Sequence, residues 1–491
     1  MATAPTSEQT VDDAESPGGS IRGWIVFAIS IGIAVVSAVV MLLPLQPYAI
    51  GLLACALMLV LIFIRVPVAF AMILPSLLGM YAMRGPRLVE STLTTLPYQQ
   101  VASWTLSVVP MFILMGLLLW KAGLTDSLYT AGRQWLGWLP GGLAVGTNMA
   151  GSGLAAVSGS TVGTTYALAR IGIPEMLKAG YDKRLAIGSV IVAGLPGQLI
   201  PPSIMLVIYA GIAEVPIGPQ LLAGIGPGLL VSALFTVMIV TFAIRWARRG
   251  EAPPTEQVSW PQRLRSLAGT WPVYLIMATI IVGMFSGVFT ATEAGAFAAV
   301  LSLGVAFIWK RKGGAWRAVA DAASSTISSV GSIFLLLIGV EALSRMFTLT
   351  GISTGFASLV ESMNLGRVEF LLMMTVVYII LGTFMEPLPM MMLTVPILLP
   401  TMGDLGISPL WYGVFAVFMG ELAVLTPPVG ILAFIIYSIT RDPEVNNGEV
   451  IELRDVYNAV WWFMPMAVVV TLVLIFFPEI ATFIPDHTTA R

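Results

Sequence analysis

The stretch GLPGQLIPPSIMLVIYA (residues 194–210) places two glycines, a single proline and a Pro-Pro pair inside one of the most apolar parts of the chain. A proline in a helix interior removes one backbone hydrogen bond and clashes with the preceding turn. We therefore expect residues 185–212 to form two half-helices separated by a break. In lipid, the backbone groups freed at a break are costly unless they are buried in protein or line a polar cavity. The stretch indicates either a kink in a packed helix or a binding site.

The composition indicates a polytopic, all-α membrane protein. Hydrophobic residues make up 57% of the 491 residues and charged residues only 10%, and apolar runs long enough to cross a bilayer recur along the chain. No basic stripe suggests a nucleic-acid partner. Cys55 is the single cysteine, which excludes a disulfide framework and a cysteine-based metal site. The single histidine, His487, lies near the C-terminus.

Hydropathy predicts about eleven transmembrane helices and two shorter apolar hairpins. The expected crossings lie near residues 24–43, 48–64, 66–83, 105–121, 185–212, 221–244, 271–288, 293–309, 327–344, 411–440 and 456–478. Residues 142–170 and 368–399 are too short for two crossings of about 20 residues each, and their centres are small or polar. We expect both to be re-entrant helical hairpins, which need protein or water around their non-helical tips.

Less apolar segments complete the layout. We expect a polar N-terminal tail, an extra N-terminal transmembrane helix, a basic cytoplasmic linker and a C-terminal tail, at residues 1–21, 22–47, 251–270 and 480–491 respectively. Residues 86–104 and 314–326 are compatible with interfacial helices. With a cytoplasmic N-terminus and a periplasmic C-terminus, most of the 24 lysines and arginines fall on the cytoplasmic side, as the positive-inside rule requires.

The chain also repeats itself. IPPSIMLVIY (200–209) resembles TPPVGILAFIIY (426–437), and the shift that takes Pro201 to Pro427 also takes Gly194 to Gly420. An odd number of crossings separates the matching segments, so we expect the two halves to be inverted relative to each other. The first repeat covers 48–250, with hairpin 142–170 and broken helix 185–212; the second covers 271–479, with hairpin 368–399 and broken helix 411–440. Transporters use broken helices of this kind to bind ions and anionic substrates near the bilayer midplane.

Several ordered motifs resemble the large membrane subunit of the tripartite ATP-independent periplasmic (TRAP) transporters. They are SGST (158–161), IGIPEMLKAGY (171–181), GQLIPPSIMLVIYAG (197–211) and GTFMEPLPMMMLTVPILLP (382–400), with RVPVAF (65–70), VPMFILMG (109–116) and TEAGAFAA (292–299) in the expected order. The resemblance covers about residues 48–478. It implies an elevator-type secondary transporter, not an enzyme, which couples uptake of a small organic acid to Na⁺.

The resemblance also implies partners and a location. A periplasmic solute-binding protein would deliver the acid, and a separate small membrane subunit with about four helices would join this chain in the bacterial inner membrane. Only one extra span, 22–47, precedes the family-like region, so we expect the small subunit as a separate chain. No cofactor is implied besides Na⁺ as the coupling ion. No Gly-Lys dipeptide occurs, which excludes a P-loop for ATP.

Oxygen atoms at the hairpin tips and the breaks are the expected Na⁺ ligands, because hard cations prefer oxygen. In the first repeat the candidates are Ser158, Gly159, Ser160, Thr161, Gly194, Gly197, Pro201 and Ser203. In the second they are Gly382, Thr383, Glu386, Gly420, Thr426 and Pro427. Small hydroxyl residues in membrane helices more often serve packing, so each single assignment is a hypothesis.

Three acidic residues are expected at membrane depth, where a carboxylate is a functional hypothesis by default. Glu386, at the second hairpin tip, is the first candidate to complete a cation site or to repel a wrong substrate. Glu421 lies beside the second break, where the first repeat has Leu195. Glu341 has Arg345 four residues later, which favours a structural ion pair. The expected substrate-facing residues are Ser160, Thr161, Glu386 and Glu421.

Two alternatives remain at this point. One is a solitary ion-coupled carrier that works without a binding protein. The other is an intramembrane serine protease with Ser158 as nucleophile, which would need a base beside the serine. The only histidine is His487 and no lysine is near Ser158 in sequence, so transport is the favoured function.

Overall fold

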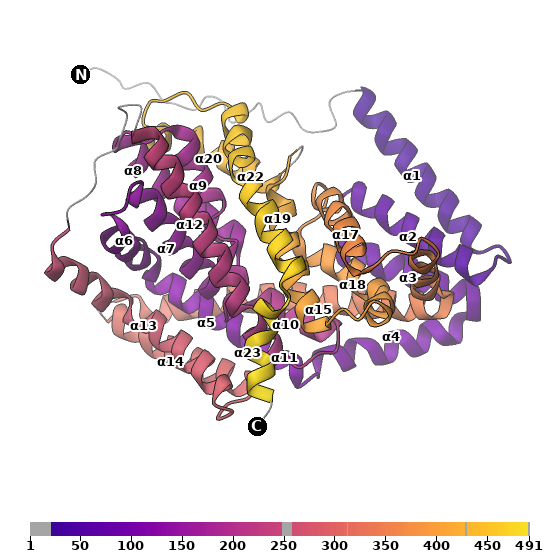
Figure 1. The fold of residues 1–491 in the computed structure, drawn as a ribbon. Helices are drawn as coiled ribbons and strands as arrows, with labels where there is room; N and C mark the ends of the chain where they lie inside the picture. Colours follow the sequence, from indigo (N-terminus) through magenta and orange to yellow (C-terminus); the bar gives the residue numbers. More distant parts are fainter. Residues whose placement is uncertain (1–20, 248–257, 312, 428–429, 490–491) are drawn as a thin grey trace, which may run out of the picture. The chain divides into compact units, whose positions relative to one another are not determined.

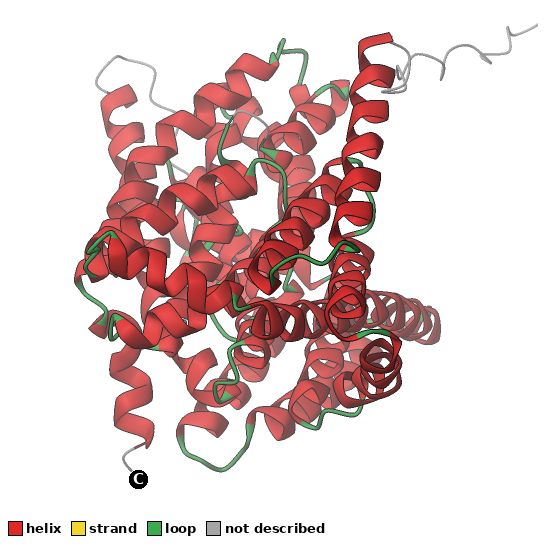
Figure 2. Ribbon diagram, turned by 90° about the vertical axis from the view of Figure 1, so that its right-hand side faces the viewer, coloured by secondary structure: helices red, strands yellow, loops and turns green. Residues whose placement is uncertain are grey.

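The computed structural model describes residues 21–247, 258–311, 313–427 and 430–489. Within these ranges the chain folds into helices without any strand, which confirms the all-α expectation (Figures 1 and 2). The predicted polar tail lies almost entirely outside the described residues, and so does part of the predicted basic linker.

The helices of the described residues fall into two units. The first unit comprises residues up to Thr94 together with Glu341–Ile352. Its helices are α1 (Ile21–Met41), α2 (Pro47–Phe63), α3 (Val68–Arg84) and the first part of α4 (Pro86–Val101). Gly51 of α2 allows a close approach within this unit, because a Cβ there would lie 2.7 Å from the Thr350 hydroxyl oxygen.

The second unit, Thr95–Val340 and Ser353–Arg491, carries both expected hairpins and both expected broken helices. Its first half contains η1 (Thr105–Ser107), α5 (Val108–Ala122), α6 (Leu124–Leu136), α7 (Gly142–Ser158), α8 (Thr161–Lys178), α9 (Lys183–Ile191), η2 (Pro196–Gln198), α10 (Ile204–Ile212), α11 (Ile217–Ala223) and α12 (Ile225–Ala247). The hairpin expected at 142–170 corresponds to α7 and α8, and the broken helix expected at 185–212 corresponds to α9, η2 and α10.

The second half begins with α13 (Trp260–Phe285), α14 (Ala291–Trp309) and α15 (Ala315–Thr350), whose last residues belong to the first unit. It continues with α16 (Ile352–Ser362), α17 (Arg367–Gly382), α18 (Pro387–Asp404), α19 (Pro409–Leu425), α20 (Ile431–Thr440), α21 (Pro443–Asn446), α22 (Leu453–Phe476) and α23 (Glu479–Thr489). The expected hairpin 368–399 corresponds to α17 and α18, and the expected broken helix 411–440 to α19 and α20.

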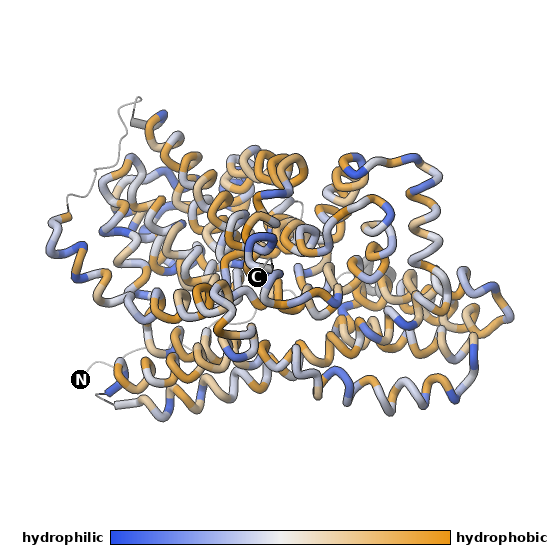
Figure 3. Tube along the Cα trace, turned by 60° about the horizontal axis from the view of Figure 1, so that its bottom comes forward, coloured by the Kyte–Doolittle hydropathy of each residue, from blue (hydrophilic) through white to orange (hydrophobic). Residues whose placement is uncertain are grey.

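The apolar surface of these helices fits a bilayer. Apolar residues recur along the whole length of most helices (Figure 3), and a helix that is apolar all round is either buried or surrounded by lipid. On α12, for example, Val231 and Phe235 are buried whereas Leu229 and Val237 are more than half exposed. Six helices of the described chain are long and apolar enough to cross a membrane, and five apolar helices are shorter. The number of about eleven crossings stays a prediction.

Two boundaries predicted from the sequence are wrong. Residues 314–326 do not form a separate interfacial helix, because α15 runs without interruption through 36 residues, and no proline interrupts it. The basic linker expected at 251–270 ends earlier than predicted. Ser259 caps the N-terminus of α13 in a capping box with Gln262, so the helix starts at Trp260.

Two other helices differ from the expectation. The residues expected as a C-terminal tail form α23, in which Ala481 is buried and the carbonyl oxygen of Ile480 packs closely on Gly226 of α12. The sequence analysis also missed α6, which buries one face only. A Cβ on its Gly132 would lie 2.5 Å from the carbonyl oxygen of Gly146 in α7, so the two helices are in close contact.

Candidate functional site

The first hairpin turns within two residues. Gly159 ends α7 in the left-handed region at φ +65°, a conformation that glycine adopts without strain. Ser160 begins α8, and its Oγ accepts a hydrogen bond from the amide of Gly163 at 3.1 Å, as an N-cap serine does. The sequence Gly-Ser therefore stops one helix and starts the next. We call residues 158–161 the first tip.

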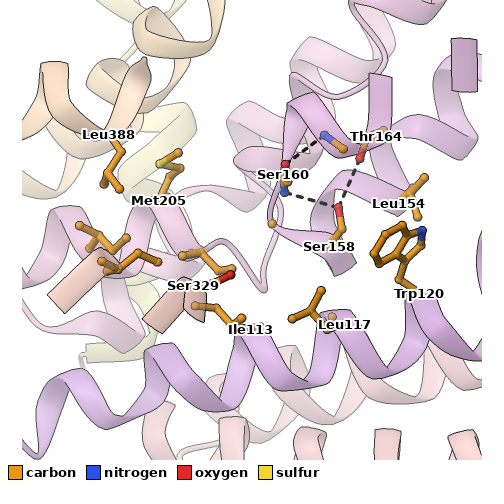
Figure 4. Close-up of a pocket in the computed structure, with 16 residues that line it drawn as sticks. Ile113, Leu117, Trp120, Leu154, Ser158, Ser160, Thr164, Met205, Ser329 and Leu388 are labelled. Atoms are coloured by element: carbon orange, nitrogen blue, oxygen red, sulfur yellow. Dashed lines mark hydrogen bonds between the residues drawn. The ribbon is translucent and has the colours of Figure 1, made fainter. Parts of the chain in front are cut away.

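Hydroxyl groups gather at the first tip. Ser158 Oγ lies 3.3 Å from Thr164 Oγ1 and accepts a hydrogen bond from the amide of Ser160 at 3.4 Å, as Figure 4 shows. Thr161 turns the other way: its hydroxyl donates to Glu421 Oε2 at 2.6 Å. The tip thus presents polar oxygens in two directions.

The first break, residues 192–203, lies against this tip. A Cβ on Gly194 would lie 2.7 Å from Thr161 Cγ2, and one on Gly197 would lie 2.6 Å from Ala155 Cβ and closer still to the carbonyl oxygen of Ser152. Only glycine leaves room for these approaches. The two glycines therefore have a second role: besides interrupting the helix, they allow the first break to contact the first hairpin.

A polar side chain forms hydrogen bonds with backbone groups at the first break. Ser203 caps α10 by accepting from the amide of Leu206 at 3.1 Å, and its hydroxyl donates to the Gln198 carbonyl. Pro201, which is buried, precedes Pro202 through a cis peptide bond. Two of the freed backbone groups at the break are thus satisfied inside the protein rather than by lipid.

Gln198 is a site residue that the sequence analysis missed. It is 1% exposed. With its amide oriented so that the oxygen faces the first tip, the oxygen accepts from the amides of Ser160 at 3.2 Å and Thr161 at 3.1 Å. A buried side-chain amide needs such partners. A lone glutamine in an apolar stretch was the signal that could have identified it.

The second tip, residues 382–386, packs on α19 in a similar way. Gly382 meets Ala423 so closely that a Cβ would overlap its side chain, and a Cβ on Gly420 would lie 3.0 Å from Pro387 Cβ. The hydroxyl of Thr383 donates to the Ile380 carbonyl at 2.7 Å, within its own hairpin. Such back-bonding is the packing use of hydroxyls in helices.

The second break, residues 426–430, is shorter than the first. Helix α19 ends at Leu425, and Thr426 donates to the Leu422 carbonyl at 2.9 Å. Pro427 is half-buried in a turn, and α20 begins after Gly430 at φ +56°. The other two residues of this break lie outside the described part of the chain.

The three acidic residues have different surroundings. Glu421 is 3% exposed and joins the second broken helix to the first tip through Thr161. Glu386 is exposed at the second tip. Glu341 pairs with Arg345 at 3.3 Å, which confirms the structural ion pair predicted for it.

A cavity of about 360 Å³ lies beside the first tip, in the size range of small-molecule sites. Ser158, Gly159 and Ser160 line it on one side, and helix α5 lies opposite, as Figure 4 shows. Leu388 of the second hairpin also lines it, so both hairpins reach the same space. Of the four residues expected to face the substrate, Ser160 lines this cavity, whereas Thr161 and Glu421 are buried against each other.

The family comparison decides the class of protein. The family described as "Tripartite ATP-independent periplasmic transporter, DctM component" matches residues 55–480. The chain belongs to the DctM family. A C4-dicarboxylate TRAP transporter large permease protein of Pseudomonas aeruginosa is 33% identical over 344 residues, which cover 69% of this chain and 78% of that protein. This confirms the family resemblance and the expectation that the chain is a transport protein.

Other members of the DctM family are similar over more of the chain. The ectoine/5-hydroxyectoine TRAP transporter large permease of Ruegeria pomeroyi is 28% identical over 87% of this chain and 97% of its own length. A sialic acid TRAP transporter large permease of Vibrio cholerae is 27% identical over 87% of this chain and 96% of its own length. This DctM-family chain is therefore a multi-pass inner-membrane permease and not an enzyme, and the serine-protease alternative is wrong.

Two solved transporters share the fold of this DctM-family chain at low sequence identity. The YdaH transporter of Alcanivorax borkumensis superimposes with a TM-score of 0.58 at 15% identity, over 83% of this chain and 90% of that one. MtrF of Neisseria gonorrhoeae superimposes with a TM-score of 0.53 at 12% identity, over 81% of this chain and 84% of that one. These likenesses support the architecture of a membrane transporter.

Proposed function

We propose that this large permease subunit couples the uptake of a small organic acid to an inward Na⁺ gradient. The observation that carries the proposal is the hydrogen bond from Thr161 in the first tip to Glu421 beside the second break. It ties the polar elements of one repeat to those of the other at a buried position. A transporter needs such a link because ion and substrate must be bound by parts that move together.

Na⁺ would be bound by oxygen atoms at the tips and breaks. Carbonyl groups freed where helices stop are unpaired within their helix and face the break. In the first repeat, the first tip and the first break lie within contact distance of each other, and the second tip likewise touches α19 just before the second break. We infer one cation site in each repeat, formed by the candidate residues named from the sequence.

The energetics of this coupling are sufficient for accumulation. If two Na⁺ accompany one monoanion, one net positive charge moves inward, which gains about 2.3 kcal/mol per 100 mV of membrane potential. Each tenfold Na⁺ gradient adds about 1.4 kcal/mol per ion. Together these terms would drive the acid inward against a gradient of several decades.

The moving part in this proposal is the body formed by the hairpins and the broken helices. Tyr209 of α10 donates to the Pro409 carbonyl at 2.7 Å, and Gln220 of α11 donates to the Leu410 carbonyl at 3.1 Å. In the second hairpin, the Tyr378 hydroxyl lies 3.2 Å from that of Tyr412 in α19. These buried links favour movement of the two repeats as one body, the elevator type of alternating access.

The inferred partners are a small four-helix membrane subunit and a periplasmic solute-binding protein that hands over the acid. We infer a cytoplasmic N-terminus and a periplasmic C-terminus from the distribution of lysine and arginine. The second candidate function is a solitary carrier in the same inner membrane. Na⁺-dependent uptake into proteoliposomes without any binding protein would favour that carrier.

A direct test uses Na⁺ itself as the probe. We expect the purified permease to unfold at a higher temperature in NaCl than in KCl of equal ionic strength. The second part of the test is uptake of the acid into proteoliposomes that contain both membrane subunits, with the binding protein outside. Equal stability in both salts, together with uptake that does not depend on a Na⁺ gradient, would contradict the coupling.

A further inference from the structure

We propose that the cavity beside the first tip selects a singly charged organic acid with a largely apolar body, in preference to a dicarboxylate. This inference rests on the proposed function, because it names the substrate class of the same transport site. It is drawn from the distribution of polar, apolar and charged side chains around the cavity.

The polar side of the cavity can hold one carboxylate. Ser158, Ser160 and Thr164 line it with hydroxyl groups that lie within hydrogen-bonding distance of each other or of the tip amides. Hydroxyl groups are neutral and each offers one donor. The proposed Na⁺ ligands belong to the same tip, so any bound cation would add its charge on this side as well. One anionic group of the substrate is therefore satisfied here.

Away from the first tip, the lining side chains offer a second carboxylate no charged partner: their polar groups are the indole N–H of Trp120 in α5 and the hydroxyl of Ser329 in α15, both neutral. Ile113 and Leu117 of α5 lie opposite the first tip, and Leu388 lies at one end (Figure 4). Ile333 of α15 also lines the cavity. Moving a carboxylate from water to such a wall is unfavourable when no partner compensates its charge. A hydrocarbon chain or ring on the same wall is favoured because its apolar surface is removed from water.

Ser329 of α15 is the one hydroxyl group away from the first tip among the residues that line the cavity. It can donate or accept one hydrogen bond. This suits a hydroxyl or keto group on the substrate, which is neutral. It does not compensate a second full charge.

Two charged residues of opposite sign are sequence neighbours of the lining residues. None of the lining residues is charged. Glu386, which is exposed, precedes the lining residue Leu388 by two positions, and its negative charge is no partner for a second anionic group. At the other end, the Lys121 ammonium lies 5.1 Å from the centre of the Trp120 ring, where a cation is attracted by the ring face.

Matched acids test the selectivity on the permease itself, so that the binding protein does not impose its own specificity. The probes are hexanoate against adipate, and 4-methyl-2-oxopentanoate against 2-oxoglutarate, each added to the detergent-purified permease in NaCl and in KCl. We expect the monoacids to raise the melting temperature in NaCl. The diacids should require about tenfold or higher concentration, the equivalent of 1.4 kcal/mol.

A single substitution should change this preference. Ser329→Arg places a guanidinium at the cavity and should strengthen adipate binding about tenfold, because a bidentate partner then compensates the second carboxylate. The control is Ser328→Arg, which adds the same charge at the preceding exposed position, outside the cavity lining. We expect the control to bind both acids as the unchanged protein does.

The outcomes separate this inference from the proposed function. Adipate binding as strong as hexanoate binding in the unchanged protein would overturn the inference, and its loss in Lys121→Gln would assign the second carboxylate to Lys121. If Na⁺ stabilises the permease but no monoacid does, the selectivity inference falls and the Na⁺ coupling stands. If the monoacids bind equally well in NaCl and KCl, the coupling falls and the selectivity stands.

Discussion

The two breaks share a Pro-Pro pair in sequence and differ in how the protein completes them. The first break, residues 192–203, is long and buried; Gln198 and Ser203 supply polar groups from within it. The second break, residues 426–430, is short, and within its described part the Thr426 hydroxyl donates to a carbonyl of its own helix. Its polar connection comes instead from Glu421, which reaches across to the first repeat. The repeated sequence therefore gives two similar breaks. The first is bonded by polar groups within the break, and the second is connected through a carboxylate on the helix before it.

The largest effect is expected for glycine-to-alanine substitutions, which test whether the first break leaves less room for a side chain than the second. Gly197→Ala would force a methyl group against the Ser152 carbonyl and Ala155, so the backbone must move, and we expect a loss of about 3 kcal/mol in the free energy of unfolding. The measurement is reversible unfolding of the purified permease in mixed micelles. Gly420→Ala is the matched change in the second repeat. Its 3.0 Å approach to Pro387 should cost about 1 kcal/mol at most, and an equal loss at both sites would contradict the comparison.

The next effect concerns the glutamine that only the first break possesses. Gln198→Leu would leave the Thr161 amide without its acceptor and the Ser160 amide with the longer hydrogen bond to Ser158 Oγ, and we expect a destabilisation of about 2 kcal/mol. Gln198→Glu keeps an acceptor oxygen at the same place and is the control. Weaker stabilisation by NaCl in the leucine variant than in the control would link the break to the proposed cation site. Similar stability of both variants would mean that the tip amides do not depend on this side chain.

A double-mutant cycle measures the connection between the repeats. Thr161→Val and Glu421→Gln are made singly and together, and we expect a coupling energy of about 1.5 kcal/mol. This is near the upper end for hydrogen bonds inside membrane proteins, because the acceptor is a carboxylate. We also expect Glu421→Leu to reduce transport more than Glu421→Gln, since glutamine retains an acceptor. Additive effects of the two changes would show that the contact contributes nothing to stability.

The smallest expected effect compares the hydroxyl groups at the two breaks. Ser203→Ala removes the N-cap of α10 and should cost about 1 kcal/mol. Thr426→Val removes a hydroxyl that bonds its own helix and should change stability by less than about 0.5 kcal/mol. Thermal unfolding of the two variants side by side provides the measurement. The reverse order would mean that the second break, and not the first, depends on its capping hydroxyl.

Features that depend on neighbouring residues could be predicted from the sequence. The hairpin turn at Gly159 and Ser160 and the breaks at the Pro-Pro pairs follow from local rules for glycine, serine and proline. Helix α23 could not be predicted in this way, because its sequence is short and contains Pro485. It is stabilised because Ile480 packs on Gly226 of α12 and Ala481 is buried.

The sequence predicted which segments contribute residues to the candidate site, but not which of their side chains are in contact. Glu386 was expected to be the principal acidic residue, yet it is exposed, and Glu421 is the carboxylate that is buried and bonded. Both lie beside a tip or a break in sequence, so their position along the chain does not distinguish them. The direction in which each side chain points depends on how α18 and α19 pack together.

The sequence by itself determined that this is an all-helical membrane permease with two helical hairpins and two broken helices. That information is local, because apolar length selects the bilayer and prolines and glycines interrupt helices wherever they occur. Only the tertiary structure decided which polar groups meet. Thr161 and Glu421 are 260 residues apart in the chain, and their hydrogen bond exists because packing brings one repeat's hairpin against the other repeat's helix.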